Sequence, residues 1–505
     1  MKRRPFSLPV RLILHDLGIL LNVPGVMALC SVPVCLWFGE YYAIAPILAT
    51  ATAAIVPGQL LYRLFPETGE ARLRHAMLVA AIGWGMISLL GAIPFWGIAT
   101  ILSVSQNTPQ TVLEFQNPWN ALFESFSGFT GTGLSVAINA SELPPSLQWW
   151  RSFTEWIDGV GIIVLVLAVL EPAMDAYQLY SAEGREKKIS LTVNATVQKI
   201  LWIYALYTVL SIVLLVVLGM PLWDSINHGL TGVATGGFSV RDDSIGTYSP
   251  VIQLAVVLIM IVGAISFPIH YQLLTQRRWS ILWKDAQHRT LWLLLGIGTL
   301  VLFVENFWLS GTFLWTDSLF QWVSALTTCG FQTVELQPWG SSVKLLLSVA
   351  MIFGGAAGST VGGLKLKRVV TLYRGVLWRF QQLFLKPHEL MRYKLDNQVL
   401  TEAKAYRQFY AAATLATLWI VSLSIGVFAL LHFVPSEYIL SDIILEAASA
   451  LGNVGLSTGI TDPNLHWAGK LTLILLMWVG RLEIVPVLLL FVSLLATASR
   501  VTNQK

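Results

Sequence analysis

The stretch Ser127-Gly128-Phe129-Thr130-Gly131-Thr132-Gly133-Leu134-Ser135 lies between two apolar segments, and three later stretches resemble it. They read Thr231-Gly232-Val233-Ala234-Thr235-Gly236-Gly237-Phe238-Ser239, Ser324-Ala325-Leu326-Thr327-Thr328-Cys329-Gly330-Phe331-Gln332-Thr333 and Ser449-Ala450-Leu451-Gly452-Asn453-Val454-Gly455-Leu456-Ser457-Thr458. Each combines small or hydroxyl residues with a glycine that an apolar residue follows. Because internal repeats fix the architecture of a chain, the sequence predicts four copies of one helix–loop–helix unit.

Each stretch follows a short amphipathic segment that we interpret as a helix. The aligned glycines are Gly133, Gly236, Gly330 and Gly455. Good helix N-caps precede these glycines by 12 or 13 positions, namely Asn120, Asp224, Asp317 and Asp442. A polar residue also stands nine positions before each glycine: Glu124, Asn227, Gln321 and Glu446. We therefore expect four short helices that point their C-terminal ends at the glycines.

The apolar residues around these stretches occur in long blocks. Of the 505 residues, 55% are hydrophobic and only 12% are charged, whereas a soluble protein carries about twice that charged fraction. Blocks such as Leu291–Val304 with their flanks reach the roughly 20 residues that a helix needs to cross a bilayer. A soluble fold would need a very large core covered by almost no charge. The predicted fold class is an all-α polytopic membrane protein.

Ten membrane spans are expected. The first two, Leu12–Phe38 and Tyr42–Leu61, form an extension over residues 1–70. The other eight form pairs, one pair around each short stretch, and give four pore repeats around a central pore. Their expected bounds are 71–175, 176–280, 281–395 and 396–505.

The basic residues support this count. With the N-terminus in the cytoplasm, all but five of the 32 Lys and Arg residues fall on the cytoplasmic side, as the positive-inside rule requires. The five exceptions are Arg151, Arg241, Lys344, Lys470 and Arg481. We expect a multi-pass protein of the cell membrane, surrounded by lipid, with both termini in the cytoplasm.

The four stretches suit the passage of a bare monovalent cation. Backbone carbonyls in an extended strand can replace the hydration shell of an ion, and glycine permits the backbone conformation that such a strand needs. A helix C-terminus aimed at the ion adds partial negative charge. No charged side chain stands in the stretches, which argues against a divalent-selective acidic ring. The candidate filter residues are Thr130, Gly131, Thr132, Gly133, Ala234, Thr235, Gly236, Thr328, Cys329, Gly330, Asn453, Val454 and Gly455.

Two further motifs, Phe353–Lys365 and Gly480–Ile484, complete a pattern that resembles the TrkH/TrkG/KtrB superfamily of potassium transporters over about residues 71–499. The two N-terminal spans favour the TrkH-like branch. The resemblance implies K⁺ as the transported ion, bound at Thr132, Gly133, Thr235, Gly236, Cys329, Gly330, Val454 and Gly455. It also implies a homodimer with one pore in each protomer, and a cytosolic TrkA/KtrA-like ring of nucleotide-binding regulatory subunits. No covalently bound cofactor and no nucleic-acid partner are expected.

The resemblance also bears on selectivity. A glycine in all four filter copies goes with potassium, and a serine in the first goes with sodium, so Gly133 indicates potassium. Two positions depart from the pattern. Gly131 stands where the TrkH-like branch often has threonine, which would loosen the discrimination of K⁺ from Na⁺. Asp158 stands where glycine is expected, and the sequence offers no account of it.

The segment Gly354–Gly363 holds five glycines inside an expected span, and each weakens a helix. The resemblance implies an intramembrane gating loop made by Gly354, Gly355, Gly358, Ser359, Thr360, Gly362, Gly363, Lys365 and Arg481. A charge at membrane depth is usually functional, and the resemblance implies that Arg481 bonds the carbonyls of the loop. The alternatives are a helical packing face for the glycines, a structural ion pair of Arg481 with Glu483 or another carboxylate, and a cytoplasmic-end anchor for Lys365.

Two other functions are alternatives to selective potassium transport. A Na⁺- or H⁺-coupled potassium symporter, or a weakly selective K⁺/Na⁺ transporter, fits the same fold. An enzyme is not expected, because the chain lacks HExxH and GxxxxGK[ST] motifs, and no convincing base accompanies Ser359.

Overall fold

The computed structural model describes residues 8–65, 73–161, 193–312, 314–386, 391–395 and 398–502. Its N-terminal part consists of α1 (Leu8–Leu20), α2 (Asn22–Trp37) and α3 (Tyr41–Leu64). Helices α1 and α2 together give an apolar run of 28 residues, Val10–Trp37, and α3 gives one of 24. These two runs confirm the two expected N-terminal spans.

Four copies of one unit follow, each with a long helix, a short helix and a second helix. The first copy has α4 (Leu73–Gly91), α5 (Ile93–Leu102), α6 (Gln110–Leu113), η1 (Glu114–Gln116), α7 (Pro118–Phe129), η2 (Ala140–Glu142) and α8 (Pro145–Val160). The second has α11 (Val193–Val217), α12 (Leu222–Ala234), α13 (Pro250–Ala264) and α14 (Phe267–Gln276).

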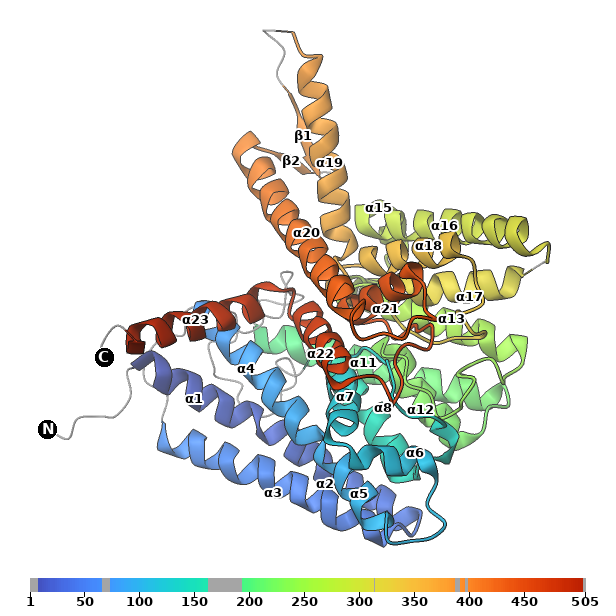
Figure 1. The fold of residues 1–505 in the computed structure, drawn as a ribbon. Helices are drawn as coiled ribbons and strands as arrows, with labels where there is room; N and C mark the ends of the chain where they lie inside the picture. Colours follow the sequence, from blue (N-terminus) through green and yellow to red (C-terminus); the bar gives the residue numbers. More distant parts are fainter. Residues whose placement is uncertain are drawn as a thin grey trace, which may run out of the picture.

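The third copy has α15 (Ile281–Lys284), α16 (Ala286–Ser310), α17 (Trp315–Leu326), α18 (Ser341–Phe353) and α19 (Leu366–Leu383). The fourth has α20 (Glu402–Leu430), α21 (Leu440–Gly452), α22 (Trp467–Arg481) and α23 (Val485–Thr502). Between α19 and α20, the strands β1 (Tyr393–Leu395) and β2 (Gln398–Leu400) pair antiparallel, with Tyr393 opposite Leu400. This hairpin and the ends of α19 and α20 project from the helical body (Figure 1).

The chain is an all-α polytopic membrane protein. Among the described residues, six helices are long and apolar enough to cross a bilayer, and the bent pairs α13–α14 and α22–α23 bring the number to eight. The two other expected spans correspond in part to α8, which ends at Val160 ahead of residues outside the described ranges, and to α18, which stops at Phe353.

The second helices of the later copies are broken. Helices α13 and α14 meet at 102°, and α22 and α23 meet at 115°. The long apolar segment around Arg481 predicts one continuous last span, with Arg481 near its middle. In the structure α22 ends at Arg481, and Glu483 and Ile484 take left-handed backbone angles (φ 55° and 70°) that a helix cannot contain.

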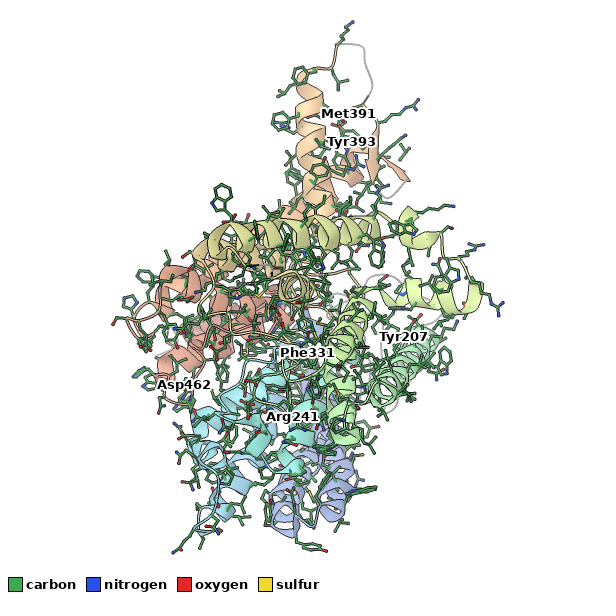
Figure 2. All side chains as sticks on the ribbon, turned by 90° about the vertical axis from the view of Figure 1, so that its right-hand side faces the viewer. Tyr207, Arg241, Phe331, Met391, Tyr393 and Asp462 are labelled. Atoms are coloured by element: carbon green, nitrogen blue, oxygen red, sulfur yellow. The ribbon has the colours of Figure 1, made fainter. Side chains whose placement is uncertain are left out.

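The copies pack in a closed ring. Each second helix lies against the short helix of the following copy: α8 packs on α12, α13 on α17, α18 on α21, and α22 returns to α7 of the first copy. Figure 2 shows Phe331, from the third stretch, near the centre of this body, with Met391 and Tyr393 on the projecting arm. The order around the ring is therefore the order along the chain.

Polar contacts explain the five basic residues that break the expected charge asymmetry. Lys344 Nζ on α18 lies 2.5 Å from Asp442 Oδ1 on α21, and Lys470 on α22 donates to Asn120 Oδ1 on α7. The guanidinium groups lie 2.7 Å from carboxylates in the pairs Arg151–Glu124, Arg241–Asp224 and Arg481–Asp158. Lys344 and Lys470 thus join one copy to the next.

We predict that Lys344→Met destabilises the protein by about 3 kcal/mol, because it leaves the Asp442 carboxylate buried without its counter-charge. Lys344 and Asp442 are only 2% and 3% exposed. The measurement is thermal unfolding of the purified protein in detergent. Adding Asp442→Asn should restore part of the loss. Lys284→Met, at an exposed lysine, is the matched control, and an equal effect of both single variants would contradict the prediction.

Candidate functional site

The four short helices end in the same way. A residue with a left-handed backbone follows each helix, directly after α12 and α21 and one residue later after α7 and α17: Gly131, Thr235, Thr328 and Asn453 have φ between 51° and 57°. The next amide donates to a carbonyl five residues earlier, in the pairs Thr132–Ser127, Gly236–Thr231, Cys329–Ser324 and Val454–Ser449, at 2.9–3.0 Å. Such left-handed C-caps satisfy helix-end carbonyls, and they give all four stretches one common register.

This register corrects the alignment of the second stretch. The residue after the capped amide is Gly133, Gly237, Gly330 or Gly455, with φ between 82° and 99°. Gly237, not Gly236, is therefore the counterpart of the other three glycines, and Gly236 corresponds to Thr132, Cys329 and Val454. With Gly237 the spacing from Asn120, Asp224, Asp317 and Asp442 becomes 13 residues in every copy. As N-caps these four residues were wrong, because the capping residues lie three positions earlier, at Asn117, Pro221, Leu314 and Ile439. Two adjacent glycines left the register open in the sequence, and the helix cap decides it.

The glycines close a ring by direct backbone contact. A Cβ built on Gly133 would lie 2.2 Å from the carbonyl oxygen of Gly236, and one on Gly237 would lie 2.3 Å from that of Cys329. The same construction on Gly330 meets the Val454 carbonyl at 1.9 Å, and on Gly455 the Thr132 carbonyl at 2.4 Å. A side chain at any of these positions would collide with backbone of the next stretch. Four glycines and four carbonyls thus form a closed circle.

Side chains on the short helices hold the outgoing strands. The Glu124 carboxylate accepts from Ser135 Oγ at 2.8 Å and from the Val136 amide at 3.0 Å. In the other copies His228 Nε2 lies 2.9 Å from Ser239 Oγ, Gln321 Nε2 lies 3.5 Å from Thr333 Oγ1, and Glu446 Oε1 lies 2.9 Å from Ser457 Oγ. The polar residue nine positions before the glycine is therefore His228 in the second copy. Asn227 was wrong for this role, and its amide donates to Trp223 O.

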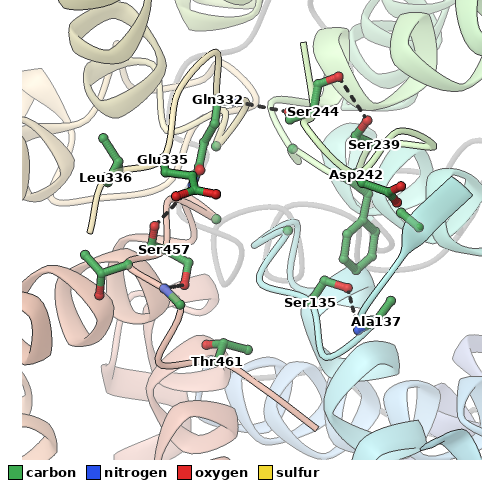
Figure 3. A pocket seen from close by; sticks show the side chains of 18 of the residues that line it. Ser135, Ala137, Ser239, Asp242, Ser244, Gln332, Glu335, Leu336, Ser457 and Thr461 are labelled. Carbon is green, nitrogen blue, oxygen red and sulfur yellow. Dashed lines mark hydrogen bonds between the residues drawn. The ribbon is translucent and has the colours of Figure 1, made fainter. Parts of the chain in front are cut away.

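A cavity of about 450 Å³ opens at one mouth of the ring and is lined by Gly133, Gly237, Gly330 and Gly455. Figure 3 shows Ser135, Ser239, Gln332 and Ser457 around it, together with the carboxylates of Asp242 and Glu335. Both cationic residues in its lining, Arg151 and Arg241, are paired with acids. The remaining acids make this mouth attractive to cations.

At the same mouth, Asp224 accepts from Arg241 Nε at 2.8 Å and from the Tyr248 hydroxyl at 2.7 Å. Burial and the hydrogen bond to Asp224 raise the pKa of Tyr248, and the hydrogen bonds with Asp224 and Tyr248 raise the pKa of Arg241. Tyr248 therefore stays neutral at physiological pH, and Arg241 stays charged.

The segment Gly354–Lys365 runs as a loop beneath the other mouth. It is not helical, so the alternative of a helical packing face is wrong. Thr235 Oγ1 donates to Thr360 Oγ1 at 3.1 Å, Gly362 N donates to Thr328 Oγ1 at 2.8 Å, and Gly363 N donates to Gly452 O at 3.0 Å. The loop thus contacts the second, third and fourth stretches. Within it, Gly354, Gly358 and Gly363 have positive φ, and Ser359 Oγ donates to Ala356 O.

The charged residues near the loop pair differently from the leading expectation. Arg481 does not bond loop carbonyls. Its Nε lies 2.7 Å from Asp158 Oδ1, and its Nη2 donates to Asp158 O. The ion-pair alternative is therefore the observed one, and its partner is Asp158. Glu483 instead pairs with Arg368 and with Lys365, whose Nζ lies 3.0 Å from Glu483 Oε1. Lys365 thus ties the end of the loop to the break between α22 and α23.

Sequence reasoning missed Glu155. This fully buried carboxylate on α8 accepts from the Phe238 amide at 3.1 Å. Its Oε2 would lie 2.3 Å from a Cβ on Gly236, so it packs directly behind the second stretch. The available signal was an acidic residue inside an apolar span, the criterion that singled out Arg481.

The fold and this ring define a class: polytopic membrane proteins built from four in-chain copies around a central circle of glycines and carbonyls. The TrkH family model, described as a cation transport protein, matches residues 46–501. The chain belongs to this family.

Relatives support the assignment along almost the whole chain. An uncharacterized cation transporter of Methanocaldococcus jannaschii is 31% identical over 491 residues, which cover 95% of each chain. The Trk system potassium uptake protein TrkH of Escherichia coli is 31% identical over 440 residues, covering 84% of this chain and 86% of its own. The crystal structure of the potassium transporter TrkH from Vibrio parahaemolyticus matches with a TM-score of 0.80 and 25% identity, over 95% of this chain and 98% of that one.

The corrected register makes a test possible. Gly237→Ala should reduce rubidium uptake about tenfold or more, because the new Cβ collides with backbone rather than with a flexible side chain. Gly219→Ala is the matched control, since Gly219 has the same φ of about 97° but nothing within 4 Å of an added Cβ. Uptake into proteoliposomes measures both. Equal losses would show that backbone strain, and not the ring contact, dominates.

Proposed function

We propose that the protein takes up potassium across the cell membrane through the ring, with the loop Gly354–Lys365 as its gate. The observation that carries the proposal is the closed circle in which each glycine meets the carbonyl of the next stretch. Carbonyl dipoles can replace the hydration shell of a monovalent cation, and no charged side chain stands in the four stretches. Relatives named as Trk potassium uptake proteins support potassium as the ion.

The electrostatics of the site favour the same ion class. Four helix C-termini face the ring, and each contributes partial negative charge. The acids Asp242 and Glu335 line the cavity at one mouth. The two arginines of the same lining, Arg151 and Arg241, are paired with other acids, Glu124 and Asp224. The proposed K⁺ ligands are the backbone carbonyls of Thr132, Gly133, Gly236, Gly237, Cys329, Gly330, Val454 and Gly455. Gly237 joins this set through the corrected register, and Thr235 moves to the loop side of the ring.

The loop is placed to gate this path. It lies beneath three of the four stretches, and its contacts with Thr235, Thr328 and Gly452 are hydrogen bonds that can be exchanged for water. Lys365 and Arg368 hold its end through Glu483. Non-helical backbone at this depth is tolerated only where it lines a cavity or is buried in protein.

We further propose an orientation for the protein in the membrane and its assembly with partners. Helix α1 begins and α23 ends on the same side of the molecule (Figure 1), which fits two cytoplasmic termini. We also propose four repeats at residues 71–175, 176–280, 281–395 and 396–505, and the bounds near 70 and 175 lie outside the described residues. A homodimer, and a cytosolic TrkA/KtrA-like nucleotide-binding ring that regulates the gate, are proposed from the family resemblance. The projecting α19–α20 arm offers surface for such a partner.

The potassium proposal predicts that K⁺ suppresses rubidium uptake into proteoliposomes far better than Na⁺ does. Gly330→Ser should erode that difference about tenfold, because its side chain would displace the Val454 carbonyl. A variant lacking Gly354–Gly363 guards against a closed gate. Equal competition by Na⁺ in the wild type would favour the weakly selective alternative, and no flux even in the loop-deletion variant would contradict the pore itself.

The gate proposal predicts that Glu483→Gln raises basal rubidium uptake several-fold, about threefold or more, because it removes two charge-assisted contacts that hold the loop end. Glu402→Gln, at an exposed glutamate on α20, is the matched control. If correctly folded Glu483→Gln protein shows reduced uptake, the contacts of Glu483 with Lys365 and Arg368 support the open state instead.

A further inference from the structure

The side of the ring that faces the loop has one unusual position. In three stretches the left-handed residue carries a side chain that makes a polar contact there. Thr235 Oγ1 donates to Thr360 Oγ1, Thr328 Oγ1 accepts from Gly362 N, and Asn453 Nδ2 donates to Thr132 Oγ1 at 3.0 Å and to Met477 O at 2.9 Å. In the first stretch the same position is Gly131, which has no side chain to offer.

A carboxylate from another helix fills that space. A Cβ built on Gly131 would lie 2.3 Å from Asp158 Oδ2, so the carboxylate packs on the glycine Cα where the other stretches carry their own side chains. Asp158 lies on α8 and is only 1% exposed. The two unusual residues of the sequence, Gly131 and Asp158, are therefore one structural feature, because each leaves room for the other.

The same carboxylate holds Arg481. Asp158 Oδ1 lies 2.7 Å from Arg481 Nε, and Arg481 Nη2 donates to the Asp158 carbonyl. Arg481 is the last residue of α22 in the fourth copy, so the pair joins the first stretch to the point where the last span breaks. The loop supports the second, third and fourth stretches, and the Asp158–Arg481 pair supports the first.

We propose that Asp158 is a positioning residue that sets both the selectivity and the rate of the ring. Its volume holds the first stretch in place of a side chain at Gly131, and its charge neutralises Arg481 beside the ion path. The inference rests on the proposed cation transport. An arginine without this partner would repel an approaching cation at low dielectric, and a stretch without this packing would lose the fixed carbonyl geometry on which selectivity depends.

The volume role is tested by a double-mutant cycle with Gly131→Thr and Asp158→Gly. Threonine is compatible with this backbone, as Thr235 and Thr328 show, and the group that its Cβ would meet is the Asp158 carboxylate. Each single variant should lower the melting temperature and the ratio of K⁺ to Na⁺ competition against rubidium uptake. The double variant should recover the melting temperature and the K⁺/Na⁺ competition ratio. Its ratio should exceed the value expected from multiplying the two single effects by about tenfold.

The charge role is tested by Asp158→Asn, which keeps the volume and removes the charge. It should keep the K⁺/Na⁺ ratio within about twofold and lower the uptake rate about tenfold, because Arg481 is then uncompensated. Adding Arg481→Gln should restore the rate. Asp243→Asn, at an exposed loop residue, is the control and should change neither quantity.

The outcomes separate this inference from the function on which it rests. If the wild type is selective but the effects of the two single variants on the K⁺/Na⁺ ratio simply multiply in the double variant, this inference is overturned and the proposed function stands. A wild type without cation flux overturns the proposed function and the selectivity role together, while the melting temperatures of the cycle still decide whether Gly131 and Asp158 form one packing unit. A fall in selectivity for Asp158→Asn as large as for Asp158→Gly overturns the division between volume and charge.

Discussion

The contact between a glycine Cα and the carbonyl of the neighbouring stretch is the constraint on which the rest of the molecule depends. It occurs four times and closes on itself, from Gly133 through Gly237 and Gly330 to Gly455. Each contact requires both a positive φ and the absence of a Cβ, which only glycine supplies without strain. The left-handed helix caps fix where each glycine falls, and the polar side chains nine positions earlier hold the outgoing strand. Irregular backbone at this depth is thereby fully supported by protein.

Buried charges join the copies that the ring brings together. Lys344 reaches Asp442 in the next copy, Lys470 reaches Asn120 across the junction of last and first, and Arg481 reaches Asp158 across the same junction. Each buried ion is costly alone and tolerable when paired and hydrogen-bonded. Three of the five basic residues that break the charge asymmetry of the sequence, Lys344, Lys470 and Arg481, thus join neighbouring copies of the ring.

The broken second helices create the space beneath the ring. Because α18 ends at Phe353 and α22 at Arg481, the chain below the ring forms the loop Gly354–Lys365 and the turn around Glu483. These two irregular segments meet in the Lys365–Glu483 pair. Both segments follow from the same departure from continuous helices.

The sequence by itself determined the membrane class, the two N-terminal spans, the four copies and three of the four ring glycines. These features depend on local hydropathy and on short-range helix and glycine preferences. Tertiary structure decided what depends on partners distant in the chain. The cap geometry placed Gly237 rather than Gly236 in the ring and gave His228 the role expected of Asn227. Packing gave Arg481 the partner Asp158, 323 residues away, and put Glu155 behind the second stretch. Five glycines indicated the break after α18, but the breaks after α13 and α22 escaped prediction. An apolar block has the same hydropathy whether or not its helix is interrupted, and only the contacts of the folded chain stabilise the interruption.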